Sequence, residues 1–105
     1  MATRYDRTCP VARTLEIIGD RWTILILRDL LLKGQRKFVD FELSLIGISP
    51  NTLSARLKIL EEAGLIQRRL YEQYPPRAEY LLTDKGRELG PVLRALRAWG
   101  EKHTR

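Results

Sequence analysis

The sequence predicts an α+β fold that is mainly α-helical, and three observations indicate it. Apolar residues recur at helical spacing through residues 10–34 and 38–63. The spacing then changes to every second residue, which is typical of a hairpin, and a last helical stripe follows it. A chain of 105 residues is expected to form a single domain over residues 1–105.

The composition is basic, with 19 Lys+Arg against 13 Asp+Glu and a net charge of +6. This balance favours a polyanionic partner, either nucleic acid or an anionic membrane surface. The longest apolar run, "WTILIL", is far shorter than the roughly 20 residues that span a bilayer. The start "MATRYDRTCP" lacks the apolar segment of a secretory signal, so a soluble, cytoplasmic protein without a membrane partner is expected.

The first half of the chain predicts two helices. Pro10 suits the first turn of a helix that ends at Gly19. Asp20 is expected to cap a second helix, "RWTILILRDLLLKG", which ends at Gly34. Because this second helix is apolar nearly all round, it should be the central buried one.

Two further helices are predicted over residues 38–63. Apolar residues after Phe38 indicate a short third helix. Ser49 is a suitable cap for a fourth helix, Pro50 suits its first turn and Gly64 its end. One stripe of this helix is predicted to be buried: Leu53, Leu57 and Leu60.

The opposite face of the fourth helix suits contact with a duplex. In a helix-turn-helix the second helix enters the major groove, where amide and hydroxyl side chains read base edges. Glu61 and Glu62 would be repelled by phosphates, so the carboxyl end should tilt away. The residues predicted to contact DNA are Ser49, Asn51, Thr52, Ser54, Ala55, Arg56 and Lys58. The alternative is a solvated amphipathic helix with a Lys58–Glu62 pair.

Residues 65–82 predict two strands joined through "EQYPP". After a helix-turn-helix such a hairpin acts as a wing, laying arginine along phosphates or into the minor groove. The predicted wing contacts are Arg68, Arg69, Tyr74 and Arg77. The alternative is an edge hairpin whose charges deter aggregation, with Glu79 pairing an arginine across the strands.

The last helix is predicted over residues 84–103, capped by Thr83, with Pro91 bending or breaking it. Its apolar stripe is longer than a small core needs, so part of it is assigned to a second subunit. The predicted dimer interface is Val11, Leu15, Leu89, Val92, Leu93, Leu96 and Trp99. The alternative is that the stripe packs only on Val11, Leu15 and Trp22 of the same chain.

Three segments, "CPVARTLEIIGDRWTILILRDLLLKGQRKF", "GISPNTLSARLKILEEAGLI" and "YPPRAEYLLTDKGREL", resemble the HxlR family of winged helix-turn-helix transcriptional regulators. The resemblance covers Cys9 to about Gly100. It implies a winged helix-turn-helix with N- and C-terminal dimerisation helices, and homodimers that bind palindromic operators in double-stranded DNA.

Several positions depart from the family's habits. Val39 stands where Ser or Asn commonly caps the third helix, and Leu43 where Arg is usual, which puts a phosphate contact by that helix in doubt. The remaining departures, which could retune operator preference or alter the wing, are Ile59, Glu72 and Leu81.

The single cysteine, Cys9, excludes an intrachain disulfide and a cysteine-cluster metal site. It precedes the first helix, where unpaired N–H groups favour a thiolate. The resemblance allows an oxidant sensor here, or regulation by a small ligand; the alternative is a small buried hydrophobe. His103 is expected to be solvated, and no catalytic set, metal site or cofactor motif is recognised, so no enzyme activity is expected.

The sequence thus predicts a sequence-specific transcriptional regulator, with repression as the default because no further domain is present to recruit polymerase. Two other classes stay open. The same basic surface would serve an architectural or RNA-binding protein without sequence preference, and a winged helix can also bind a partner protein.

Overall fold

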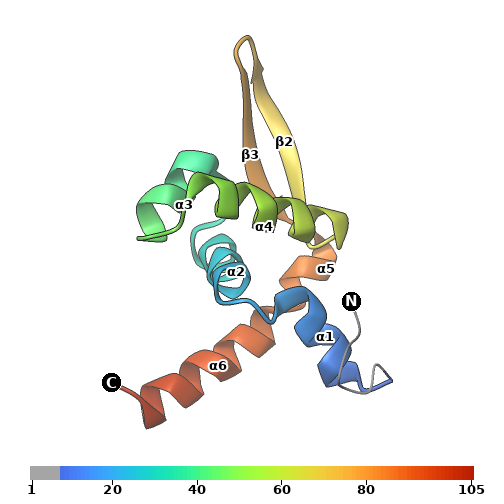
Figure 1. Cartoon of the computed structure of the whole chain (residues 1–105), viewed down its shortest axis with the longest axis vertical. Coiled ribbons are helices and arrows are strands. Elements are labelled where there is room, and N and C mark those ends of the chain that lie inside the picture. Colours follow the sequence, from blue (N-terminus) through green and yellow to red (C-terminus); the bar gives the residue numbers. More distant parts are fainter. Residues whose placement is uncertain (1–7) are drawn as a thin grey trace.

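Figure 1 shows a computed structural model of the chain, in which residues 8–105 are described. The elements are α1 (Pro10–Ile18), α2 (Arg21–Lys33), β1 (Arg36–Lys37), α3 (Phe38–Ser44), α4 (Pro50–Glu62), β2 (Ile66–Gln73), β3 (Pro76–Leu82), α5 (Asp84–Arg87) and α6 (Gly90–His103). The predicted fold class, α+β and mainly helical, is confirmed. The expectation about a secretory signal rests largely on residues 1–7, which lie outside the described residues.

Helix α2 lies at the centre of the molecule, between α3 and α4 on one side and α1 and α6 on the other (Figure 1). It begins as predicted, because the Asp20 carboxylate accepts a hydrogen bond from the Thr23 N–H at 3.0 Å. Ile26 and Leu27 are fully buried, which confirms the prediction that this helix is central.

The core forms where the predicted leucine stripe of α4 faces α2. Buried residues from α1, α2, α3, α4, the turn after α3 and the base of the hairpin make one cluster; they are Ile18, Ile26, Leu27, Leu30, Phe41, Leu45, Leu53, Leu57, Leu60, Leu65, Ile66 and Leu82. Because three leucines of α4 are in this cluster, the orientation of α4 about its own axis is fixed by packing.

The sheet is antiparallel in the order β1-β3-β2. The basic segment "KGQRK" was not predicted to form a strand, but its Arg36 and Lys37 form β1, paired with Tyr80 and Glu79 of β3. The hairpin strands are also longer than predicted, so that only Tyr74 and Pro75 form the tip between β2 and β3. Backbone pairing with β3, which the residue pattern does not reveal, accounts for both differences.

The predicted helix over residues 84–103 is divided into α5 and α6. The chain turns at Glu88 and Leu89, and Pro91 lies in the first turn of α6, so the break expected at this proline is confirmed. Gly86 allows α5 to lie against the base of the wing, because an added Cβ would lie 2.1 Å from the Leu65 carbonyl oxygen.

The cap of α3 differs from the expectation attached to Val39. The cap position is Lys37, whose N–H donates to the Asp40 carboxylate at 2.8 Å. Val39 lies within the first turn and is half exposed. The acidic group three residues after the cap position satisfies this helix end, so no Ser or Asn is needed there.

Candidate nucleic-acid interface

The amino end of α4 is built by its cap. The Ser49 Oγ accepts the Thr52 N–H at 3.1 Å and donates to the Thr52 Oγ1 at 2.9 Å. These bonds hold both hydroxyls at the helix end, where unpaired N–H groups and the helix dipole favour an anion. Ser49 is exposed at the start of α4, and Thr52 is partly buried.

Four predicted reading residues lie on the exposed face of α4, opposite the buried leucines. They are Asn51, Ser54, Ala55 and Lys58. Within residues 8–105, Lys58 has no ion pair. The Lys58–Glu62 pair, which was expected if α4 is only a solvated amphipathic helix, is therefore not formed. The surface offers an amide, a hydroxyl, a methyl group and one ammonium group to whatever binds it.

Arg56 was predicted to contact DNA but is held by the protein itself. Its Nε donates to the Asp20 Oδ2 at 2.9 Å, and the same oxygen accepts the N–H and hydroxyl of Thr23. Partial burial raises the pKa of Asp20, but the hydrogen bonds from Thr23 and Arg56 outweigh it and keep this pKa below its ordinary value. Arg56 thus ties α4 to the start of α2.

The carboxyl end of α4 is anchored to the body of the molecule. The Lys85 Nζ donates to the Ala63 carbonyl at 2.7 Å, and the Thr83 hydroxyl donates to the Gly64 carbonyl at 2.6 Å. Glu61 and Glu62 are exposed beside this end. The two ends of α4 therefore differ: the carboxyl end is acidic and anchored to the body of the molecule, and the amino end is polar and lacks acidic residues.

The arginines of the wing that were predicted to contact DNA differ in their ion pairs. Arg69 donates to the Glu79 Oε2 at 2.7 Å directly across the strands, as the alternative reading expected. Arg77 lies 3.7 Å from Glu72 in a loose, exposed pair. Arg68 has no ion pair within the described part of the chain. Tyr74 at the tip is 90% exposed.

Figure 1 shows the wing rising from the side of the molecule that carries α3 and α4, while α1 and α6 extend from the other side. Leu43 of α3 is 75% exposed, and Ile46 in the turn between α3 and α4 is also exposed, so these two positions present apolar rather than basic side chains. Ile59 of α4 is 41% exposed. Leu81 is partly buried in β3.

The predicted subunit-contact residues fall into two groups. Leu89 and Leu93 pack partly against the core of their own chain. The other five are exposed: Val11, Leu15, Val92, Leu96 and Trp99. Trp99 is 62% exposed, with its ring beside His103 at a centroid distance of 4.9 Å. The alternative was that this stripe packs only on Val11, Leu15 and Trp22 of the same chain. Trp22 is partly buried against the core, as Leu89 and Leu93 are, whereas the exposure of Val11 and Leu15 does not fit this alternative.

Cys9 is exposed at the cap position of α1 and makes no side-chain capping bond. This exposure does not fit the alternative of a small buried hydrophobe. Among residues 8–105, no group of His, Cys, Asp and Glu has the arrangement of a metal site. In the same residues, no helix is long and apolar enough to cross a bilayer.

A buried ionic cluster was not foreseen. Asp29 is 3% exposed and pairs with Arg28 at 3.0 Å and with Arg36 at 3.7 Å. Arg36 also donates to the Asp40 carbonyl at 3.2 Å. The cluster therefore joins α2, β1 and α3. The signal in the sequence is a single acidic residue, Asp29, within a mostly apolar helix, and it does not identify Arg36 as a partner.

Comparisons with known proteins agree with this geometry. A family model described as HxlR-like helix-turn-helix matches residues 17–105. The chain is 44% identical over 92 residues to an uncharacterised HTH-type transcriptional regulator of Synechocystis sp., covering 88% of this chain and 67% of that protein. It is 41% identical over 95 residues to the HTH-type regulator YdeP of Bacillus subtilis, covering 90% and 73%. A solved structure, the redox regulator HypR in its oxidised form, superimposes with a TM-score of 0.84 at 34% identity, covering 92% of this chain and 99% of that one.

The charge on Asp20 should make stability depend on pH. Because the folded-state pKa of Asp20 is lowered, its contribution is present above the ordinary aspartate pKa of about 3.9 and is lost as pH falls through the lower folded value. Asp20→Asn keeps a capping acceptor and removes the charge. At pH 7 it should cost about 0.2–1 kcal/mol of unfolding free energy, since both partners are partly exposed.

Urea unfolding of wild type and Asp20→Asn at several pH values measures this contribution. The difference between the two proteins should shrink between about pH 5 and pH 3. Asp20→Ala also removes the capping acceptor and should cost about 1 kcal/mol more at every pH. A wild-type advantage that is the same at pH 7 and pH 3 would show that the charge has no role.

Proposed function

The chain belongs to the HxlR-like helix-turn-helix family of transcriptional regulators, and from this premise we propose that it binds a palindromic operator as a homodimer. The observation that carries the proposal is the face of α4 that lies opposite the buried leucines. Its amino half is exposed, polar and without acidic residues. This face enters the major groove.

Base reading falls to the exposed side chains of this half. Asn51 has the amide that pairs with adenine N6 and N7, and Ser54 donates to or accepts from most base edges. Ala55 fits against a thymine methyl group, and Lys58 reaches a phosphate or a guanine. Thr52 contributes indirectly, because its N–H caps the helix end together with Ser49. Arg56 also contributes indirectly, because its hydrogen bond to Asp20 fixes the position of α4.

The wing supplies contacts to the sugar–phosphate backbone. Arg68 and Arg77 are the arginines best placed for this role, because Arg69 is already neutralised by Glu79. Tyr74 at the exposed tip reaches furthest from the body. The proposed division is that α4 specifies sequence and the wing adds affinity without regard to sequence.

The dimer is supported by the exposed apolar residues of α1 and α6. A single helix reads only a few base pairs, whereas two helices related by a two-fold axis read half-sites about one turn, or roughly 34–36 Å, apart. Joining Leu96 and Trp99 to a second copy removes a large apolar surface from water. Repression then follows from occupation of the operator.

An oxidant acting at Cys9 is the proposed signal. The thiol is exposed at a helix start, and the similar protein HypR is described as a redox regulator. Modification there would change the surface that α1 offers to the second subunit.

Asn51→Ala should reduce the preference for operator over random duplex DNA by about 1–3 kcal/mol, because one base pair is no longer read. Competition binding at one fixed salt concentration measures this preference for an operator found by footprinting. Gln67→Ala, an exposed amide at the base of the wing, is the matched control and should leave the preference unchanged. Wild-type protein that binds both duplexes within about tenfold would instead favour an architectural role, since specific sites are usually at least 10³ tighter.

Arg68→Ala and Arg77→Ala should each weaken binding to operator and random DNA by a similar factor. Each should also lower the slope of log K against log salt by about 0.9, because one fewer counterion is released. Lys102→Ala removes the same charge at the far end of α6 and is the control. Slopes that are equal in all four proteins would remove the wing from the DNA contact.

A mild oxidant should release wild-type protein from its operator and leave Cys9→Ser bound, because only the thiol is altered in the comparison. Gel shift with and without subsequent thiol reduction measures release and its reversal. Equal release of both proteins would contradict the role of Cys9 without affecting the proposal that α4 binds DNA.

A further inference from the structure

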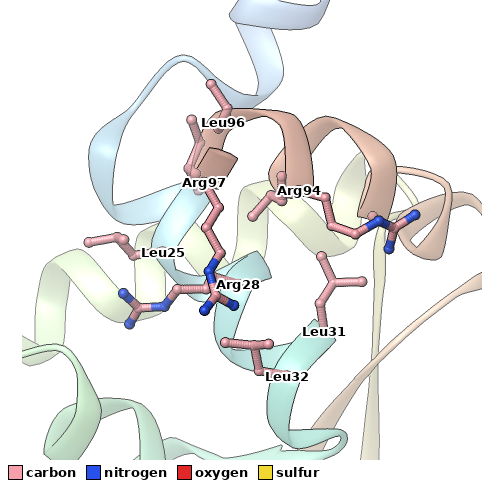
Figure 2. A pocket seen from close by; sticks show the side chains of 10 residues that line it. Leu25, Arg28, Leu31, Leu32, Arg94, Leu96 and Arg97 are labelled. Atoms are coloured by element: carbon pink, nitrogen blue, oxygen red, sulfur yellow. The ribbon is translucent and has the colours of Figure 1, made fainter. Parts of the chain in front are cut away.

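A cavity of about 720 Å³ is lined by residues of α2 and α6 (Figure 2). Helix α6 lies on the opposite side of α2 from α4 (Figure 1). The volume of the cavity is within the roughly 300–1,000 Å³ that is usual for small-molecule sites. Six apolar side chains line it: Ile24, Leu25, Leu31, Leu32, Leu93 and Leu96. Leu32 and Leu96 are 63% and 51% exposed, so the cavity is an apolar groove open to solvent at these two residues.

All charged residues in the lining are arginines: Arg28 from α2, and Arg94 and Arg97 from α6. In Figure 2, Arg97 extends from α6 across the groove toward the side where Arg28 projects from α2, while Arg94 points in a different direction. Two positive charges from different helices thus border one apolar surface. An anionic group between them would relieve their repulsion.

Two of these arginines, Arg94 and Arg97, are weakly engaged by the protein. Arg97 lies 3.8 Å from Glu101 in an exposed pair along the helix, an arrangement worth little in water. Arg94 has no ion pair within residues 8–105. Arg28 donates to the Asp29 Oδ1 from its Nε at 3.3 Å and its Nη2 at 3.0 Å, while its side chain stays 42% exposed. The guanidinium groups of Arg94 and Arg97 are free to bind a carboxylate through paired hydrogen bonds, and Arg28 adds a second positive charge beside it.

We infer that this groove binds a small monocarboxylate with an apolar body, such as a medium-chain fatty acid. The body lies on Leu25, Leu31 and Leu93, and the carboxylate lies between Arg28 and Arg97. Charge complementarity at one border and an unbroken apolar floor together select an amphipathic anion over a neutral or cationic molecule.

Arg28 connects this site to the rest of the molecule. Its partner Asp29 also pairs with Arg36, and Arg36 lies in β1, which pairs with β3 of the wing. The Oδ2 of Asp29 accepts no hydrogen bond from the described residues, so this buried carboxylate depends on its two arginines. A ligand that draws Arg28 from Asp29 changes the charge balance beside Arg36, at the base of the wing. This regulatory step rests on the proposed function; binding itself does not.

Displacement of 8-anilino-1-naphthalenesulfonate from the full chain tests the site without DNA. Octanoate should displace this dye, and octylammonium, which has the same chain length and opposite charge, should not. Arg97→Gln should weaken octanoate binding about tenfold or more, because a hydrogen-bonded charge is lost. Lys102→Gln removes the same charge from α6 outside the groove and should bind octanoate as wild type does. Equal displacement by both amphiphiles, or unchanged binding by Arg97→Gln, would overturn the proposal.

A second copy of the chain is the competing occupant, because Leu96 is also assigned to the subunit contact. Wild type should bind octanoate equally at protein concentrations below and above dimer formation. Binding that appears only in a monomeric Val11→Glu, Leu15→Glu variant would show that the partner subunit fills the groove, and would overturn the ligand site. Octanoate binding without operator binding would remove the proposed function alone, and operator binding without octanoate binding would remove this site alone.

Discussion

The enclosure of α2 is the constraint on which the rest of the structure depends. A helix with apolar residues on nearly every side has to be surrounded, and α1, α3, α4, α6 and β3 all contact it. Ile26 and Leu27 have no exposed surface as a result. Because one rigid helix separates them, the polar face of α4 and the apolar faces of α1 and α6 are held on different sides of the molecule. The proposed contact with DNA and the proposed contact with another subunit therefore do not compete for the same surface.

Most helices could be predicted because their ends are encoded locally. Asp20, Ser49 and Thr83 each accept a backbone N–H three residues ahead, as their residue types indicate. β1 could not be predicted, since two basic residues have no periodicity and become a strand only through pairing with β3. The cap of α3 was misplaced for a related reason, because Asp40 reaches back from within the helix to fill a role expected of a side chain at the cap itself.

The exposed face of α4 followed from the spacing of its leucines, but the partners of its charged residues did not. Arg56 is 36 residues from Asp20 in the sequence, and only the packing of α4 on α2 brings the two together. The Asp29 cluster has the same origin, because it needs β1 in place beside α2. Periodicity predicts which side of a helix is exposed; it does not predict which exposed charge another element neutralises. The arginines of the wing illustrate this, since one is paired closely, one loosely and one not at all within residues 8–105.

The short length of β1 has a mechanical consequence. The sheet has three strands only where Arg36 and Lys37 face Tyr80 and Glu79; beyond that point the hairpin is a two-stranded ribbon, with a register shift between Leu70 and Glu72. Such a ribbon has little stability of its own and twists readily. The hairpin is thus held firmly only at its base, where β1 pairs with β3, and we expect it to bend mainly near the register shift in β2. In the proposed complex with DNA, the tip follows flanking minor grooves of different widths while α4 keeps its depth in the major groove. Tolerance for the flanking sequence would then lie in the wing, and selectivity for the central sequence in α4.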